Sequence, residues 1–354
     1  MSGSKYLASS ADGKEILHIL ESSAAKGSIE LIYTRRPDAY ESYMKDTGEA
    51  RVFISRDGSR AVGTCAELIR EVYIGGEICR AAYICGLKKD AAYAGGVGFG
   101  ASLIKDLQQN DVDFYYCSVV SENAEARKMF GKSRRFISLE PILGYKTYIL
   151  NPKARIKAPK HGFTFRRATE RDTAKLLEFL NAEGKKRDMF PVVRTTEDYH
   201  GLHIGDFYLL LDGEDIVAAA ALWNQTEFKQ YVVKRYGGLM KTARFFNPLL
   251  SALRYIKLPK ENEPLDFPML SFFLCKDDSA DNFRIFLSEI RREIVKHYGM
   301  FVIGLPDSHF AKPIMDKLPG IGFRTELYEI RFPWSGQTYK APDVSHAFFE
   351  CGLL

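Results

Sequence analysis

Four glycines fall within the six positions 95–100, and a helix pattern follows them directly. Residues 92–107 read AYAGGVGFGASLIKDL, in which Leu103, Ile104 and Leu107 repeat at helical spacing. Glycine lets a backbone approach a ligand without interference from Cβ and adopts positive φ where a turn requires it. The unpaired N–H groups and the positive dipole end of a helix N-terminus attract phosphate. The pattern therefore predicts a segment whose main-chain amides bind a phosphorylated ligand.

Two common phosphate-binding motifs do not fit this stretch. A dinucleotide-binding fingerprint needs its first strand at the start of the domain, whereas these glycines follow the third of three predicted antiparallel strands. A P-loop needs Gly-Lys-Ser/Thr, and the stretch runs on as Gly-Ala-Ser. A glycine-rich connection without a ligand is the remaining alternative, because a single glycine motif has low specificity.

Length and composition favour an ordinary globular chain of two domains. The chain has 354 residues, of which 46% are hydrophobic. The net charge of +5 is spread along the sequence without a run of five like charges, so a nucleic-acid partner is not expected. Six cysteines form no CxxC pair and no His/Cys cluster at metal spacing, so we expect a reduced, cytoplasmic protein without a metal. Apolar runs are too short to span a bilayer, and no membrane partner is expected.

The first half of the chain reads as strands and helices in alternation. Turn signals at Asp57-Gly58 and Gly75-Gly76 divide residues 50–87 into three antiparallel strands. Further strands are predicted over residues 28–34, 112–120 and 144–150, and helices over residues 14–25, 36–45, 100–110 and 121–132.

The second half repeats much of this order. A hairpin is predicted to turn at Asp212-Gly213. Other strands are predicted over residues 163–169, 268–278, 300–309, 322–332 and 345–354, and helices over residues 170–184, 279–299 and 310–318. The matching order predicts one α/β fold used twice.

The glycine stretch and a second motif together resemble the GNAT superfamily of acyl-CoA N-acyltransferases. That family pairs a Gln/Arg-x-x-Gly-x-Gly/Ala turn after its fourth strand with an Asn-x-x-Ala-x-x-x-Tyr helix after its fifth. Gly98-Phe99-Gly100 matches the first motif, or Gly96-Val97-Gly98 in a shifted register, and NAEARKMF at residues 123–130 matches the second.

The resemblance implies an α+β, layered fold of two tandem GNAT-like domains, each a mixed, mostly antiparallel sheet flanked by helices. It divides the chain into an acyl-CoA-binding domain at residues 1–150, a linker at 151–162 and a degenerate copy at 163–354. The linker prediction also follows from two prolines and five basic residues in that segment.

The resemblance also implies where coenzyme A binds. The loop amides would hold its diphosphate, and the fourth and fifth strands would part to admit the pantetheine arm. The residues that this places at the coenzyme are Ile84, Gly86, Leu87, Lys88, Gly95, Gly96, Val97, Gly98, Phe99, Gly100, Ala101, Ser102, Asn123, Ala126, Arg127 and Phe130.

Two positions depart from the family pattern. The Gln/Arg that opens the glycine motif is Gly95 or Tyr93, depending on the register. The tyrosine that often acts as general acid is Phe130, which has no proton to donate. The acid role is therefore open to another group or to water.

Direct acylation of an amine needs a group that accepts a proton. The predicted catalytic residues are Glu67, which lies among apolar neighbours in the third predicted strand of the chain (the middle one of the antiparallel triplet), and Glu122, at the tip of the strand that precedes NAEARKMF. A structural, ion-paired or solvated role is the alternative for each of them.

Only the first half should bind the coenzyme, because Asp277, Asp278 and Asp281 follow the corresponding strand of the second half and would repel phosphate. The resemblance implies an N-acetyltransferase that moves an acetyl group from acetyl-CoA to a primary amine of a small acceptor. The alternatives are a non-catalytic acyl-CoA sensor and a transferase of longer acyl or aminoacyl groups. The oligomeric state stays open.

Overall fold

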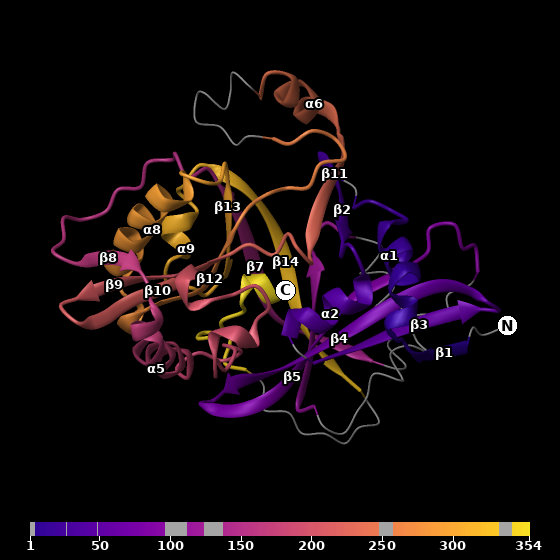
Figure 1. Cartoon of the computed structure of the whole chain (residues 1–354), viewed down its shortest axis with the longest axis horizontal. Helices are drawn as coiled ribbons and strands as arrows, with labels where there is room; N and C mark the ends of the chain where they lie inside the picture. The colour runs from indigo at the N-terminus through magenta and orange to yellow at the C-terminus, as the bar shows by residue number, and fades with distance from the viewer. Residues whose placement is uncertain are drawn as a thin grey trace.

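One 12-stranded sheet runs through both halves of the chain. The computed structural model describes residues 4–25, 27–47, 49–95, 112–123, 137–247, 258–332 and 342–354. The strand order is β1-β3-β4-β5-β6-β14-β7-β13-β12-β10-β9-β8, and a separate two-stranded ribbon pairs β11 with β2. Figure 1 shows the two ends of this sheet at opposite sides of the molecule.

The first half supplies most strands at one end of the sheet. Its elements are β1 Ser4–Leu7, α1 Gly13–Glu21, β2 Ile29–Thr34, α2 Ala39–Thr47, β3 Ala50–Asp57, β4 Arg60–Ile74, β5 Glu77–Lys89, β6 Phe114–Val120 and β7 Ser138–Leu150. Gly58, Gly75 and Gly76 have positive φ, which confirms the two predicted turns. The predicted helices at residues 100–110 and 121–132 lie outside the described residues, apart from the first three positions of the second.

The second half builds the other end. Its elements are β8 Thr164–Arg167, α5 Thr173–Gly184, β9 Phe207–Asp212, β10 Asp215–Trp223, β11 Gln230–Tyr236, α6 Gly238–Phe245, β12 Met269–Cys275, α8 Ala280–Ile294, β13 Phe301–Pro306, α9 Lys312–Met315 and β14 Gly320–Arg331. Both halves thus carry mixed sheet with flanking helices, which confirms the predicted fold class.

The two halves exchange a strand with each other. β14 of the second half lies between β6 and β7, antiparallel to both. β7 of the first half in turn lies between β14 and β13, so it joins the sheet of the second half. Residues 151–163 contain no helix or strand, but the sheet is continuous across them. The division of the chain at residues 151–162 therefore stays a prediction about sequence units.

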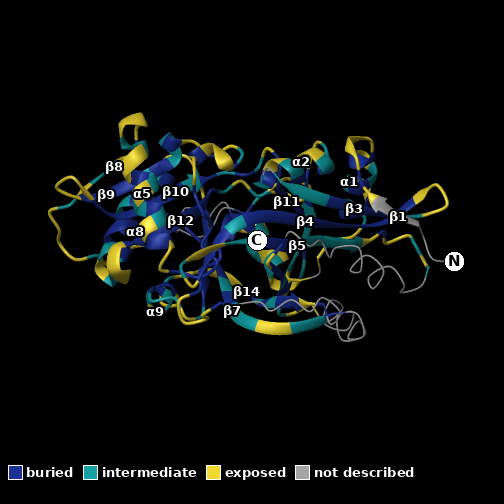
Figure 2. Cartoon of the chain, turned by 90° about the horizontal axis from the view of Figure 1, so that it is seen from below, coloured by how far each residue is buried: buried dark blue, intermediate teal, exposed yellow. Residues whose placement is uncertain are grey.

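Buried apolar residues continue across the exchange. One cluster contains Tyr43 of α2, Tyr145 of β7, Leu327 of β14 and Phe349 near the end of the chain. In the second half, α5 and α8 cover opposite faces of the sheet, each with its own buried cluster. Figure 2 shows the buried residues concentrated along the sheet from one end to the other.

The structure differs from the local predictions at four places. Residues 345–354 were expected to form a strand, but within them only a 3-10 turn at Cys351–Leu353 is regular. Their backbone instead makes individual contacts with several elements at the centre of the molecule. β1, β11 and α6 were not predicted; β1 has four residues, too few for a period-two pattern to stand out.

The exchange predicts that the two halves unfold together. Leu327→Ala removes a fully buried side chain from β14 and should lower the free energy of unfolding by about 2–5 kcal/mol. The whole urea transition should shift as one, with coincident far-UV circular dichroism and tryptophan fluorescence curves. The control Ile321→Ala, on the same strand at a 41% exposed position, should change stability by less than about 0.5 kcal/mol. A second, separate transition would contradict the prediction.

Candidate functional site

Two parallel strands at the middle of the sheet separate part-way along their length. β5 pairs with β6 from Ala81 opposite Phe114 to Ile84 opposite Cys117. Beyond these residues β5 continues against β4, and β6 continues against β14. The facing backbone of residues 85–89 and 118–120, here called the open edge, has no neighbouring strand between its two sides among the described residues, which is where an extended ligand could pair. This is the separation that the family resemblance implies.

A β-bulge lies at the start of the open edge. Cys85 pairs with Ala66 and Lys88 pairs with Thr64, so Gly86 and Leu87 lie opposite the single residue Cys65. Gly86 has a φ of +61°, a conformation that favours glycine. The bulge turns backbone groups of β5 out of the ladder, at the point where the two strands part.

The second half contains a similar pair of separating parallel strands with a bulge, and a residue near the end of the chain binds to that bulge. β12 and β13 pair in parallel only at Met269 and Val302. Phe272 and Phe273 lie opposite Ala220 in a bulge of β12, where Phe272 has a φ of +53°. The N–H of Phe272 donates to Oε2 of Glu350 at 2.5 Å. A bulge amide of this fold thus holds a carboxyl oxygen in the second half.

Tyr43 of α2 contacts the bulge of the first half. A Cβ placed on Gly86 would lie 2.1 Å from Oη of Tyr43, so a side chain larger than hydrogen does not fit there. Tyr43 is fully buried, and burial is the main cause that raises the pKa of its hydroxyl. The guanidinium carbon of Arg35 lies 4.0 Å from the centre of its ring.

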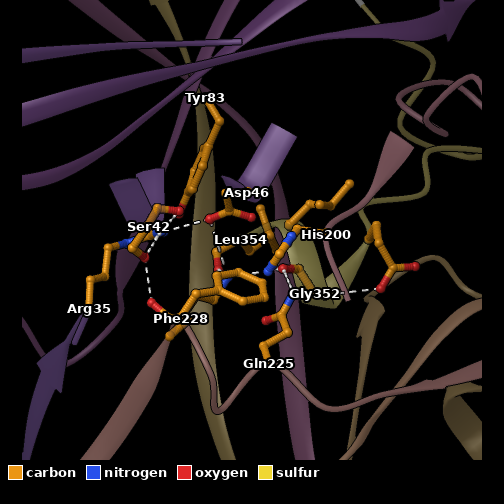
Figure 3. Close-up of polar contacts among 12 residues, drawn as sticks. Arg35, Ser42, Asp46, Tyr83, His200, Gln225, Phe228, Gly352 and Leu354 are labelled. Atoms are coloured by element: carbon orange, nitrogen blue, oxygen red, sulfur yellow. Dashed lines mark hydrogen bonds and ion pairs between the residues drawn. The ribbon is translucent and has the colours of Figure 1, made fainter. Parts of the chain in front are cut away.

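Three buried charges, on Arg35, Asp46 and Lys229, lie close to Tyr43 and join the two halves. Figure 3 shows Arg35 and Asp46 among them, near the last residues of the chain. In this central charged cluster, Nη2 of Arg35 lies 2.6 Å from Oδ2 of Asp46, and Nζ of Lys229 lies 3.9 Å from the same oxygen. Burial alone would raise the pKa of Asp46, but Lys229 and Arg35 reverse this and lower it. Burial lowers the pKa of Lys229. The cluster therefore combines one carboxylate of the first half with cations from both halves.

The last residues of the chain lie against this cluster. Lys229 Nζ donates to the carbonyl oxygen of Gly352 at 2.9 Å, and Gln225 donates to the same oxygen at 2.8 Å. Arg70 of β4 donates to the carbonyl oxygen of Leu353 at 3.1 Å. Figure 1 accordingly shows the C-terminus at the centre of the molecule, between the two halves.

Several buried polar atoms near the cluster lack a hydrogen-bond partner among the described residues. They are Oη of Tyr43, Oδ1 of Asp46, Nε and Nη2 of Arg70, and Oε1 of Gln225. Buried polar atoms are paired in most native structures, so a group of exceptions marks a place where a ligand or water completes the bonding. A small cavity next to Lys229 is lined by Gln225, Thr226, Lys229, Tyr231, Leu265, Phe267 and Met269.

The predicted catalytic glutamates lie in different surroundings. Glu67 of β4 is fully buried, lies opposite Ile84, and has Oε2 3.3 Å from Nη1 of Arg51. Because side chains alternate along a strand, Glu67 faces the side of the sheet opposite to that of Tyr43, which packs with Ala66. Glu122 is exposed, just beyond the end of β6. The structure thus places neither carboxylate in the central charged cluster.

The predicted coenzyme residues divide into four groups. Ile84, Gly86 and Leu87 lie at the bulge and where the strands part. Lys88 lies on the open edge, but its Nζ donates to the carbonyl oxygens of Leu20 and Ser23, which lie at the C-terminal end of α1 and just beyond it. Burial lowers the pKa of Lys88.

The remaining predicted residues continue from the open edge. Gly95 is the last described residue before the gap, and Asn123 lies three residues past β6, with its N–H donating to the carbonyl oxygen of Val120 at 2.8 Å. The predictions that lie outside the described residues concern Gly96, Val97, Gly98, Phe99, Gly100, Ala101, Ser102, Ala126, Arg127 and Phe130.

Sequence reasoning missed Tyr43, Asp46, Arg35 and Lys229. A partial signal was present in α2, where the buried positions 39, 42, 43 and 46 share one helix face that carries Ser, Tyr and Asp. Polar groups on the buried face of a helix need partners, which is a cue for a functional site. Nothing in the local sequence linked that face to Lys229.

Comparison with solved structures identifies the architecture. The N-myristoyltransferase of Saccharomyces cerevisiae with bound myristoyl-CoA is similar with a TM-score of 0.59 and 8% identity, over 98% of this chain and 89% of that chain. A protein of unknown function from Enterococcus faecalis, described as a probable N-acyltransferase, has a TM-score of 0.52 and 11% identity, over 94% and 73% of the two chains. The fold is that of the GNAT-type N-acyltransferases.

A third solved structure agrees with this fold. A GCN5-related N-acetyltransferase from Anabaena variabilis has a TM-score of 0.51 and 10% identity, over 92% of this chain and 72% of that chain. No family model and no curated protein matches the sequence.

The described part of the chain shows two further features. None of its helices has the length and apolar character needed to cross a membrane. Its His, Cys, Asp and Glu side chains form no group of three or more that could hold a metal ion.

The buried charges predict a large effect of removing Asp46. Asp46→Ala leaves Arg35 and Lys229 buried without their counter-ion, so the free energy of unfolding should fall by about 3–5 kcal/mol. The matched control Glu214→Ala breaks an exposed pair with Lys175 and should cost no more than about 1 kcal/mol. Urea denaturation of both variants checks this; equal effects would contradict the assignment of Asp46 as the central counter-ion.

Proposed function

We propose that this protein is an N-acyltransferase that moves an acyl group from a coenzyme A thioester to a primary amine by direct attack. The observation that carries the proposal is the separation of β5 from β6 after Ile84 and Cys117, with a bulge at Gly86 where they part. The similar N-myristoyltransferase was solved with bound myristoyl-CoA, which supports an acyl-CoA ligand for this fold.

In this proposal the pantetheine arm lies along the open edge as an added strand. Backbone groups of residues 85–88 would pair with its amides, because those groups face away from the β4 ladder at the bulge. The diphosphate would meet the amides of Gly96 to Gly100, as the sequence predicts, and Asn123 would flank the arm from the end of β6.

The bulge would also bind the reacting carbonyl oxygen. A backbone N–H aimed at that oxygen stabilises the negative charge that develops as the amine attacks. The second half supports this role, because its bulge amide at Phe272 already binds a carboxyl oxygen of Glu350. The same contact occupies the bulge amide of the second half, which supports a single coenzyme site, located in the first half.

The amine would approach from the central charged cluster and the cavity beside Lys229. Its proton must leave for direct attack. Of the two predicted bases, Glu122 is open to solvent beyond β6, whereas Glu67 is ion-paired with Arg51 on the other face of the sheet. We therefore propose Glu122 as the proton acceptor, acting through water, and a structural role for Glu67.

Calorimetry and thiol release test the proposal. Acetyl-CoA should bind the protein, and free thiol should appear when a panel of small primary amines is added. Gly98→Glu should abolish coenzyme binding through charge and bulk, whereas Gly162→Glu, at a position with open space around it, should leave binding unchanged.

A comparison of acetyl-CoA with octanoyl-CoA and myristoyl-CoA decides the donor, for which we propose acetyl. Binding without thiol release for any amine would favour a sensor instead.

Direct attack predicts that no acyl-enzyme forms. Cys85 lies on the open edge, but burial raises the pKa of its thiol to about 11, so the nucleophilic thiolate is scarce at neutral pH. Intact-mass spectrometry after incubation with acetyl-CoA alone should show the unmodified protein. A stable increase by the mass of one acetyl group, located on Cys85, would indicate a covalent route.

A further inference from the structure

The hydroxyl of Tyr43 is a buried polar group with no hydrogen-bond partner among the described residues. Its side chain is fully buried on the inner face of α2, in the apolar cluster shared by both halves. A buried hydroxyl without a partner lowers stability, so a ligand or a water molecule is expected to complete its bonding.

This hydroxyl is aimed at the bulge. Only the absence of a Cβ at Gly86 lets Oη come so close to the backbone of β5. Gly86 directly follows Cys85, which still pairs with Ala66 of β4, so Gly86 is the first residue of the bulge. The hydroxyl therefore lies at the place where the thioester end of the pantetheine arm would stop.

We propose that Tyr43 is a catalytic residue whose hydroxyl donates a hydrogen bond to the carbonyl oxygen of the bound thioester. The inference rests on the proposed function and adds a side-chain donor to the bulge amide. The sequence comparison offered no such donor, because the family tyrosine is replaced by Phe130 and Tyr43 belongs to a different element.

The proposed step keeps the tyrosine neutral throughout. The amine lone pair forms the C–N bond while the C=O π electrons move to oxygen, which accepts the hydrogen bond from Tyr43. Collapse re-forms the carbonyl and breaks the C–S bond, and the departing thiolate takes a proton from water. The ammonium proton of the adduct passes to a base or to water.

The surroundings favour hydrogen-bond donation over proton transfer. Burial raises the pKa of the Tyr43 hydroxyl, so it keeps its proton at physiological pH. Arg35, held by Asp46, lies over the ring at 4.0 Å and orients it. A donor that is positioned before the reaction needs no reorganisation as charge develops.

Tyr43→Phe tests the inference, since it removes only the orphaned oxygen. We expect kcat to fall about 100-fold, as for loss of one oxyanion donor, with an unchanged Kd for acetyl-CoA. The melting temperature should stay the same or rise, because no hydrogen bond is lost. A purely structural role predicts the opposite, namely a lower melting temperature with kcat retained.

The matched control is Tyr236→Phe. Tyr236 is also buried, but its hydroxyl donates to the carbonyl oxygen of Pro259 at 2.9 Å, away from the bulge. This variant should lose stability and keep its kcat.

An infrared measurement on bound acetyl-CoA labelled with ¹³C at the acyl carbonyl gives a second readout. The carbonyl stretch should move to lower frequency in the wild type and return toward its solution value in Tyr43→Phe. Turnover and carbonyl stretch that are equal in the two proteins would overturn the inference alone. A wild type that neither binds acetyl-CoA nor releases thiol would overturn the proposed function and this inference with it.

Discussion

The structure depends on how the backbone of β6 is shared between its neighbours. On one side β6 pairs with β14 as far as Val120. On its other side it pairs with β5 only as far as Cys117, and the two strands separate after that residue. β14 comes from the second half and is held in place by β7 along its whole length. The strand exchange therefore does two things at once: it joins the halves into one sheet and fixes the strand from which β5 separates.

The two halves show one device in two states. β5 in the first half and β12 in the second half each carry a bulge with a residue of positive φ, which is Gly86 in β5 and Phe272 in β12. In the second half the chain's last segment reaches the bulge and Glu350 bonds its amide. In the first half a tyrosine hydroxyl without a described partner faces the bulge instead. Internal repetition thus shows, within one molecule, what kind of oxygen such a bulge can hold.

The centre of the molecule holds polar groups whose burial costs stability. Arg35, Asp46 and Lys229 are buried together, and buried ion pairs seldom exceed the stability of a well-packed apolar core. The unpaired atoms of Arg70 and Tyr43 add to this cost. Buried charges with perturbed pKa values are frequent at functional sites, and these lie between the two halves.

Local sequence predicted most strands, most helices, the turns at Gly58 and Gly75, and the glycine-rich stretch after β5. Each depends on residues within a few positions of one another, so periodicity and turn chemistry were sufficient to predict them. Only the tertiary structure decided the exchange of β7 with β14, the contact of Glu350 with Phe272, and the meeting of Asp46 with Lys229. These contacts join residues far apart in the chain, and the folded backbone alone determines which of many polar residues come within bonding distance.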